Sequence, residues 1–212
     1  MHPALGRCGN DGFVPTPTGS LETVVARAPA WSAALEDLCA LVEAHRPRDA
    51  REGEAKARFL VELGRLPRPY DRGADRVHVT ASAVVAGTRG TVLHRHRRLG
   101  RWIQPGGHVD AGESPAEAVL RETAEETGLE AVHPDGGPEL LHLDVHPAAD
   151  HVHLDLRFLL LAPDRDPSPG PGESPEVRWF TWDDAEAIAD PALIGALRAA
   201  RDELRRMGTD ER

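Results

Sequence analysis

Apolar residues recur at helical spacing in the first third of this chain. From about Pro29 to His45, and again after Asp49, they return every three or four positions, which predicts two amphipathic helices joined by a short proline turn. Asp49 and Glu52 resemble a capping pair that opens the second helix. Each helix has one apolar stripe, so we expect the helical hairpin to pack against the main domain or against a partner subunit.

The spacing changes to alternation after the proline- and glycine-containing linker from Pro67 to Asp75, and alternation is typical of strands. The chain is therefore expected to divide into a flexible tail over residues 1–20, a helical extension with its linker over 21–74, and a main domain over 75–208. Strands are expected around 77–85, 91–96, 102–103, 141–145, 152–160 and 177–180.

The clearest helix signal lies inside the main domain. Ser114 is a good N-cap, Pro115 suits the first helical position, and Glu117 stands where a capping-box carboxylate reaches back. Gly128 is a natural left-handed residue at the other end. These signals predict a helix over 115–127.

Three carboxylates crowd one face of that helix. Glu122, Glu125 and Glu126 are related by spacings of three and four residues, so their side chains emerge close together. Arg121 lies beside them but cannot neutralise three charges. Carboxylate oxygens without Cys or His at ligand spacing suit Mg²⁺ or Mn²⁺, which commonly complete their coordination with substrate phosphates. The alternative is a solvated acidic face.

The stretch from Gly107 to Leu129 resembles the Nudix box, G-x5-E-x7-R-E-U-x-E-E-x-G-U, at every fixed position. Thr123 departs from the bulky aliphatic residue usual at the first U. The resemblance implies an α+β fold, a Nudix-like α/β/α sandwich with a mixed sheet, here preceded by the helical hairpin. It also implies a metal-dependent hydrolase, with Mg²⁺ or Mn²⁺, that cleaves a small-molecule nucleoside diphosphate derivative.

Roles in the box follow from the same resemblance. Glu122, Glu125 and Glu126 match metal-binding carboxylates, and the Gly107 carbonyl is a further candidate ligand. Arg121 matches the arginine that orients the glutamates, and Glu113 the residue that holds loop and helix together. Glu125 is the first choice for the base that deprotonates water, with Glu126 next. Because the family can supply the base or an extra ligand from a distal loop, Glu173 and Glu176 are alternatives; they flank the end of a Pro/Gly-rich loop over 163–175.

Candidate substrate contacts lie outside the box. The densest positive cluster, which includes Arg95 and Arg97 and precedes Trp102, is interpreted either as a solvated hairpin end or as a rim that contacts phosphate or base. In the next strands, Leu141, Leu143 and Val145 are expected opposite His142, Asp144 and His146, and Val152, Leu154, Leu156, Phe158 and Leu160 opposite His151, His153, Asp155 and Arg157.

The polar rows of these two strands also leave two interpretations. They form the water-facing side of an antiparallel pair, or they line a substrate cleft or in part bind metal. The spacing of His151 and His153 is too common to assign a zinc site. The candidate substrate-binding residues are therefore Arg95, Arg97, Trp102, His142, Asp144, His153, Asp155 and Arg157.

Composition narrows the function further. The formal net charge of −10 argues against general nucleic-acid binding, and no apolar run is long enough for a membrane span. A cytoplasmic location is expected. Cys8 and Cys39 precede the main domain, which disfavours isomerase chemistry that needs a cysteine near the cleft. A catalytically inactive, nucleotide-binding regulatory module is the alternative function, and a homodimer that swaps the hairpin is an alternative to packing within one chain.

Overall fold

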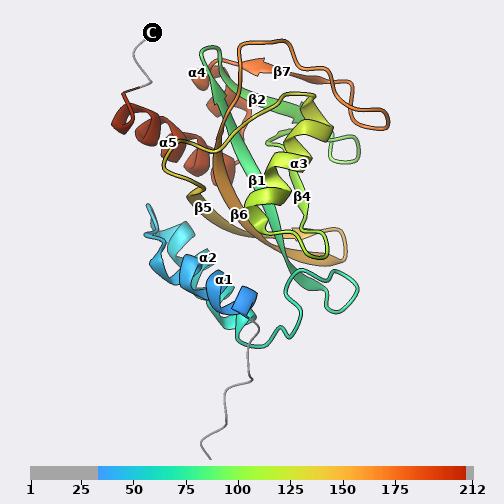
Figure 1. Cartoon of the computed structure of the whole chain (residues 1–212), viewed down its shortest axis with the longest axis vertical. Coiled ribbons are helices and arrows are strands. Elements are labelled where there is room, and N and C mark those ends of the chain that lie inside the picture. The colour runs from blue at the N-terminus through green and yellow to red at the C-terminus, as the bar shows by residue number, and fades with distance from the viewer. Residues whose placement is uncertain (1–32, 209–212) are drawn as a thin grey trace, which may run out of the picture. The chain divides into compact units, whose positions relative to one another are not determined.

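A seven-stranded mixed sheet organises the described part of the chain, residues 33–208 of this computed structural model (Figure 1). β1 runs parallel to β6, and the other pairings are antiparallel: β1 with β2 and β4, β2 with β3 and β7, and β5 with β6. The strands are β1 (Val77–Gly87), β2 (Gly90–Arg95), β3 (Trp102–Ile103), β4 (Gly106–His108), β5 (Glu139–Ala148), β6 (His151–Leu161) and β7 (Val177–Phe180). The expected strands are thus all present, with β4 in addition.

Five helices accompany the sheet in this part of the chain: α1 (Ala33–Ala44), α2 (Ala50–Leu63), α3 (Pro115–Thr127), α4 (Trp182–Ile188) and α5 (Pro191–Arg206). The prediction for α3 is confirmed, since Ser114 and Glu117 form a reciprocal capping box and Gly128 ends the helix with φ 69°. The tail over 1–20, the start of the first helix and Cys8 lie outside the described residues. None of the helices in residues 33–208 has the length and apolar character needed to cross a bilayer.

Two hydrophobic cores lie on opposite faces of the sheet (Figure 1). Alternate residues of β1 and β6 face the first core, together with α1, α2 and α3, and the expected row Leu154, Leu156, Phe158 and Leu160 is confirmed there. The second core joins α4 and α5 to Val84, Leu93 and Leu159. Helices therefore cover both faces of the sheet, and the N-terminal hairpin packs within its own chain.

Glu52 connects the hairpin to the sheet in a way that the capping pattern does not predict. Asp49 caps α2 by accepting from the backbone N–H of Glu52, but the Glu52 carboxylate is fully buried and does not return to Asp49. It accepts from the backbone N–H groups of Arg48 (2.7 Å) and Leu143 (3.0 Å) and contacts His45. Burial alone would raise the pKa of Glu52, but these hydrogen bonds outweigh it and lower the pKa to about 2. The carboxylate thus satisfies a donor on the edge strand β5.

A bulge in β5 corrects one expected row. The register slips between Leu140 and His142, so Leu141 is an extra residue in the pairing with β6. Leu141 joins the core beneath α5, whereas Leu143 and Val145 face the core beneath α3. The prediction that Leu141 shares the face of Leu143 is therefore wrong, because one inserted residue inverts the alternation.

Candidate active site

Two glycines of β4 bring the sheet directly against α3. Register with β1 pairs Gly106 with Ser82 and Gly107 with Ala81. A side chain at Gly106 would meet the Ser82 backbone, and one at Gly107 would collide with the carboxylate of Glu122. The Gly106 N–H donates to Glu126 Oε2 at 2.9 Å. The absence of a Cβ therefore lets the glutamates of α3 reach the backbone of β4.

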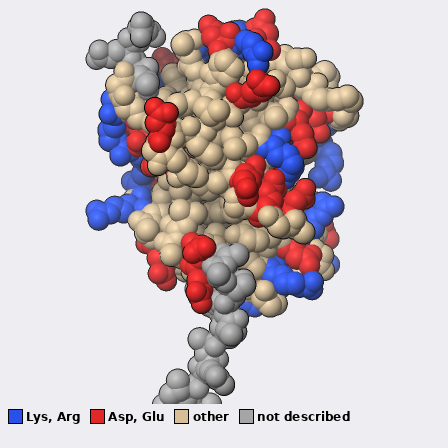
Figure 2. All heavy atoms as spheres, in the orientation of Figure 1, with Lys and Arg blue, Asp and Glu red and all other residues tan. Residues whose placement is uncertain are grey.

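Arg121 ties the loop, the strand and the helix together. It donates to both carboxylate oxygens of Glu113 (3.0 and 2.9 Å), to Glu122 (3.0 Å), to Glu125 (3.3 Å) and to the carbonyl of His108 (2.9 Å). The hydrogen bonds from Arg121 lower the pKa of Glu113, and the Glu113 carboxylate in turn raises the pKa of Arg121. One guanidinium thus orients three carboxylates of this region, Glu113, Glu122 and Glu125. Figure 2 shows acidic and basic side chains side by side on the face that presents α3.

Glu122 and Glu126 remain under-compensated despite this arginine. Their side chains are only 16% and 13% exposed. Burial raises the pKa of Glu126 to about 8, and repulsion from Glu122, Glu173 and Glu125 adds to the effect against a single opposing N–H from Gly106. Burial also raises the pKa of Glu122, although Arg121 opposes it. Buried carboxylates that lack sufficient positive charge fit a bound divalent cation.

His94, which belongs to the positive cluster around Arg95 and Arg97 in the sequence, is a neighbour of the glutamates. Its Nε2 lies 3.7 Å from Glu126 Oε2 and makes no hydrogen bond among the described residues. Burial lowers the pKa of His94 to about 4, so the ring is neutral and does not compensate the carboxylate. The sequence places His94 in the positive cluster beside the box, but not its buried position against Glu126.

The loop between β6 and β7 closes against the C-terminal end of α3. Ser168 N–H donates to the Thr127 carbonyl (2.7 Å), and Gly170 N–H to that of Glu125 (2.8 Å). Glu173 consequently comes near enough to Glu122 and Glu126 to help raise the pKa of both. The loop therefore brings a fourth carboxylate, Glu173, to the acidic face.

Residues 76–200 match the family model of the NUDIX domain, which covers more than half of the chain. The chain belongs to this family. A crystal structure of a hydrolase of the NUDIX family from Clostridium perfringens superposes with a TM-score of 0.53 and 26% identity, over 61% of this chain and 99% of that one. The α+β fold, with helices on both faces of a mixed sheet, is that of the family.

Curated relatives match over shorter segments. Bis(5'-nucleosyl)-tetraphosphatase [asymmetrical] of Mus musculus is 63% identical over 30 residues, which are 14% of this chain and 20% of the relative. Putative 8-oxo-dGTP diphosphatase 2 of Mycobacterium tuberculosis (strain CDC 1551 / Oshkosh) is 49% identical over 55 residues, 24% of this chain and 39% of the relative. The chain thus spans well under half the length of these curated relatives.

Arg95 and Arg97, which the sequence analysis named as candidate substrate contacts, anchor the loop between β6 and β7. Arg95 Nη1 lies 3.2 and 3.1 Å from the two carboxylate oxygens of Glu176, and Arg97 Nη2 donates to the Glu173 carbonyl. Glu176 is therefore paired with Arg95, whereas Glu173 extends toward the glutamates of α3. Trp102 stacks edge-on with Phe180 at 4.9 Å between ring centroids, and Arg178 covers it at 5.0 Å.

Four residues of the polar rows of β5 and β6 are buried, so the interpretation as a water-facing surface is wrong for His142, Asp144, Asp155 and Arg157. Arg157 donates to Asp155 and to Asp144, each at 3.0 Å. His142 lies against Gly195 of α5, which leaves no space there for a side chain. The described contacts of these residues are internal, and a substrate contact for them remains a prediction.

Two hydroxyl groups of β1 complete this network, and they were missed from the sequence. Thr80 and Ser82 donate to the two oxygens of Asp155 at 3.0 and 2.8 Å. Register between β1 and β6 pairs Thr80 with Asp155 and Ser82 with Arg157. The sequence of β1 does not indicate that Thr80 and Ser82 bond Asp155, because this contact depends on β1 and β6 being neighbours in the sheet.

Proposed function

We propose that this chain is a metal-dependent pyrophosphohydrolase that cleaves the diphosphate bond of a nucleoside diphosphate derivative by attack of water on phosphorus. The observation that carries the proposal is the convergence of Glu122, Glu125 and Glu126 beside the Gly107 backbone with one arginine among them. Family membership and the hydrolase names of the relatives support it. The matched region 76–200 would be the hydrolase domain, with α1 and α2 as an extension.

Mg²⁺ or Mn²⁺ would be held by Glu122, Glu125, Glu126 and the Gly107 carbonyl, and when bound it neutralises phosphate charge and makes water more acidic. Arg121 keeps three of the surrounding carboxylates oriented, and Glu113 fixes Arg121 in turn. Gly106 and Gly107 leave room for the carboxylates to converge. The contacts of Arg121, Glu113 and the two glycines described above support these proposed roles.

Glu125 is the proposed general base. Its carboxylate is 53% exposed at the rim of α3, where a water molecule and a substrate phosphate have access. Glu122 and Glu126 face β4 instead, which suits ligands better than a proton acceptor. Glu173 is the alternative base, because the loop carries it to the same acidic face.

The substrate proposed is a small molecule with a diphosphate linked to a nucleoside. The curated relatives are named for cleaving a dinucleoside tetraphosphate and an oxidised nucleoside triphosphate. Both compounds contain a phosphoanhydride bond next to a nucleoside, which is the part that the acidic face would receive. Arg95, Arg97 and Trp102 are the proposed contacts for the remainder, together with the polar residues of β5 and β6.

The test is a product screen on the full chain with Mg²⁺ or Mn²⁺ and a panel of dinucleoside polyphosphates, nucleoside triphosphates, sugar nucleotides and ADP-ribose. Glu125→Gln and Glu126→Gln are run beside Glu130→Gln, a control whose side chain is 90% exposed just after α3. We expect metal-dependent cleavage that both site variants lose and the control retains. Binding without turnover of any compound would favour the regulatory module instead.

A further inference from the structure

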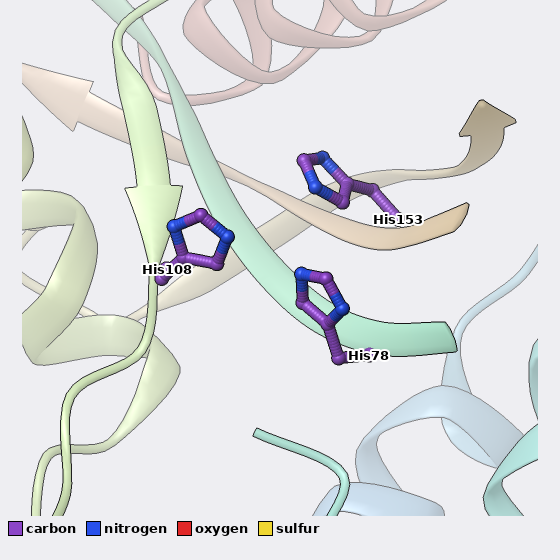
Figure 3. Close-up of side chains that lie close together, drawn as sticks. All are labelled: His78, His108 and His153. Atoms are coloured by element: carbon purple, nitrogen blue, oxygen red, sulfur yellow. The ribbon is translucent and has the colours of Figure 1, made fainter. Parts of the chain in front are cut away.

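Three histidines approach one another on the face of the sheet opposite α3 (Figure 3). His78 comes from β1, His108 from β4 and His153 from β6. Strand register explains their meeting, because His78 pairs directly with His153, and His108 pairs with Thr80, two residues along β1 on the same face. Three segments distant in sequence thus contribute one imidazole each.

The rings are spaced for a shared ligand. Ring centroids lie 5.1 Å apart for His78 and His108, 4.9 Å for His78 and His153, and 5.6 Å for His108 and His153. One nitrogen from each ring lies within 4.8 Å of the others. Nitrogens around a tetrahedral zinc ion lie about 3.3 Å apart, so side-chain rotations of about an ångström would close the site.

His78 is buried, although its ring finds no hydrogen-bond partner of normal geometry among residues 33–208. It is 1% exposed. Burial, together with the neighbouring His108 and His151, lowers the pKa of His78 to about 4, with a weak opposing contribution from the Asp75 backbone. Burial and His146 likewise lower the pKa of His153 to about 4. Neutral imidazoles have free lone pairs, the form in which histidine binds metal.

Two carboxylates lie near this cluster, one paired with the neighbouring His146 and the other close enough to act electrostatically on His153. His146 Nδ1 lies 2.9 Å from Asp144 Oδ2, and its ring is 5.4 Å from that of His153. Asp155 acts on His153 electrostatically and raises its proton affinity. Burial, and after it the charge of Arg72, lowers the pKa of His108.

We propose that His78, His108 and His153 form a binding site for Zn²⁺ or a similar divalent transition ion, with the fourth position open to water or hydroxide. Imidazole ligands select this class of ion, whereas the carboxylates of α3 suit Mg²⁺ or Mn²⁺. The two sites share β4 but not a face: Gly107 lies against Glu122, and the next residue, His108, points to the other side.

The experiment is a titration of the full chain, free of any histidine tag, with Co²⁺ as a spectroscopic substitute for zinc. Excess Mg²⁺ is present to occupy the carboxylate site. We expect one Co²⁺ per chain with the visible absorption of four-coordinate cobalt. His108→Ala and His153→Ala each weaken binding by at least about 100-fold. The matched control His133→Ala keeps full affinity, because His133 lies elsewhere, against Phe158 and the Ala116 carbonyl.

Thermal denaturation in EDTA checks that the variants are folded. The number of Co²⁺ ions bound per wild-type chain tests the proposal without any variant. Failure of wild type to bind Co²⁺ or Zn²⁺ would overturn the proposal. So would binding that survives both histidine variants and disappears in Glu126→Gln, since that would place the ion at the acidic face. The proposed hydrolase is tested separately, because Glu126→Gln is expected to lose turnover and keep Co²⁺.

Discussion

On the α3 face, Glu122 and Glu126 are largely shielded from solvent, and the single arginine beside them also pairs with Glu113 and Glu125. On the α5 face, Arg157 lies between Asp144 and Asp155. Both regions bury carboxylates, yet their pKa values move in opposite directions. Burial raises the pKa of Glu122 and Glu126. Burial would also raise the pKa of Asp144 and Asp155, but the neighbouring Arg157 and His146 outweigh it and lower both.

This contrast separates a structural network from a functional one. The α5-face carboxylates find their counter-charges and hydroxyl donors within the chain, so nothing further is needed for their burial. The α3-face carboxylates outnumber their single arginine, and a divalent cation would supply part of the missing positive charge. Strong pKa shifts mark both regions, but only an uncompensated shift indicates a ligand.

The largest expected effect comes from removing the counter-charge on the α5 face. Arg157→Met leaves Asp144 and Asp155 buried without their shared guanidinium, which should destabilise the fold by about 3–5 kcal/mol. Urea denaturation measures the loss. The control Arg198→Met removes an exposed ion pair with Glu186 and should change stability by less than about 1 kcal/mol. Equal losses in the two variants would contradict the contrast.

Removing a charge on the α3 face should instead leave the fold intact and abolish function. Glu126→Gln is expected to reduce turnover by about 100-fold or more, because it removes a proposed metal ligand, while Tm stays unchanged or rises. Steady-state kinetics with saturating Mg²⁺ on the substrate found in the screen measures it. Full activity in this variant would contradict the assignment of Glu126, and Glu130→Gln controls for loss of an exposed carboxylate.

The lack of positive charge around Glu126 should also make the free energy of unfolding depend on pH when EDTA keeps the site free of metal. The folded-state pKa of Glu126 is about 8 against an ordinary value of 4.5, so the folded state holds the extra proton and its stability falls as pH rises toward 8. Buried histidines with pKa values of about 4 have the opposite effect, but only below pH 6.5.

Between pH 6.5 and 8 the carboxylates with raised pKa values, Glu126 and Glu122, remain, and the variant Glu126→Gln identifies the contribution of Glu126. Chemical denaturation should show stability falling there in wild type and falling less in Glu126→Gln. Saturating Mg²⁺ should reduce the wild-type slope, because a bound cation displaces the proton. Parallel slopes for wild type and variant would show that Glu126 is already ionised in the metal-free fold.

The smallest effect is expected at the rim. Arg95→Ala removes an exposed pair with Glu176 and should cost less than about 1 kcal/mol of stability. The same variant should raise KM more than it lowers kcat if Arg95 contacts the distal part of the substrate. A loss of kcat comparable to that of Glu126→Gln would instead indicate that Arg95 takes part in the chemical step.

Local signals account for most of the elements. The boundaries of α3 follow from Ser114, Pro115 and Gly128 alone, because capping is satisfied by neighbours within four residues. The strands are predicted from the alternation of apolar and polar residues, a pattern that depends only on which face of the sheet each side chain occupies. The prediction from alternation is wrong at Leu141. A β-bulge there moves this side chain to the other face of the sheet, and no residue near it in the sequence indicates the bulge.

The candidate site divides in the same way. The box residues are near one another in sequence, so helical periodicity already places Glu122, Glu125 and Glu126 on one face. Glu173 and His94 reach them only through the loop and the neighbouring strand. The position of Glu52 predicts a capping contact with Asp49. Its carboxylate instead accepts a hydrogen bond from the backbone of Leu143 in β5, 91 residues away.

By itself, the sequence determined the acidic helix, its caps and its family resemblance, because those depend on short-range geometry. The tertiary structure decided that the polar rows of β5 and β6 are buried and that His78, His108 and His153 meet, since both depend on the order of strands in the sheet. It also decided which buried charges are compensated. Compensation is a matter of distance in space, and residues far apart in the chain supply it.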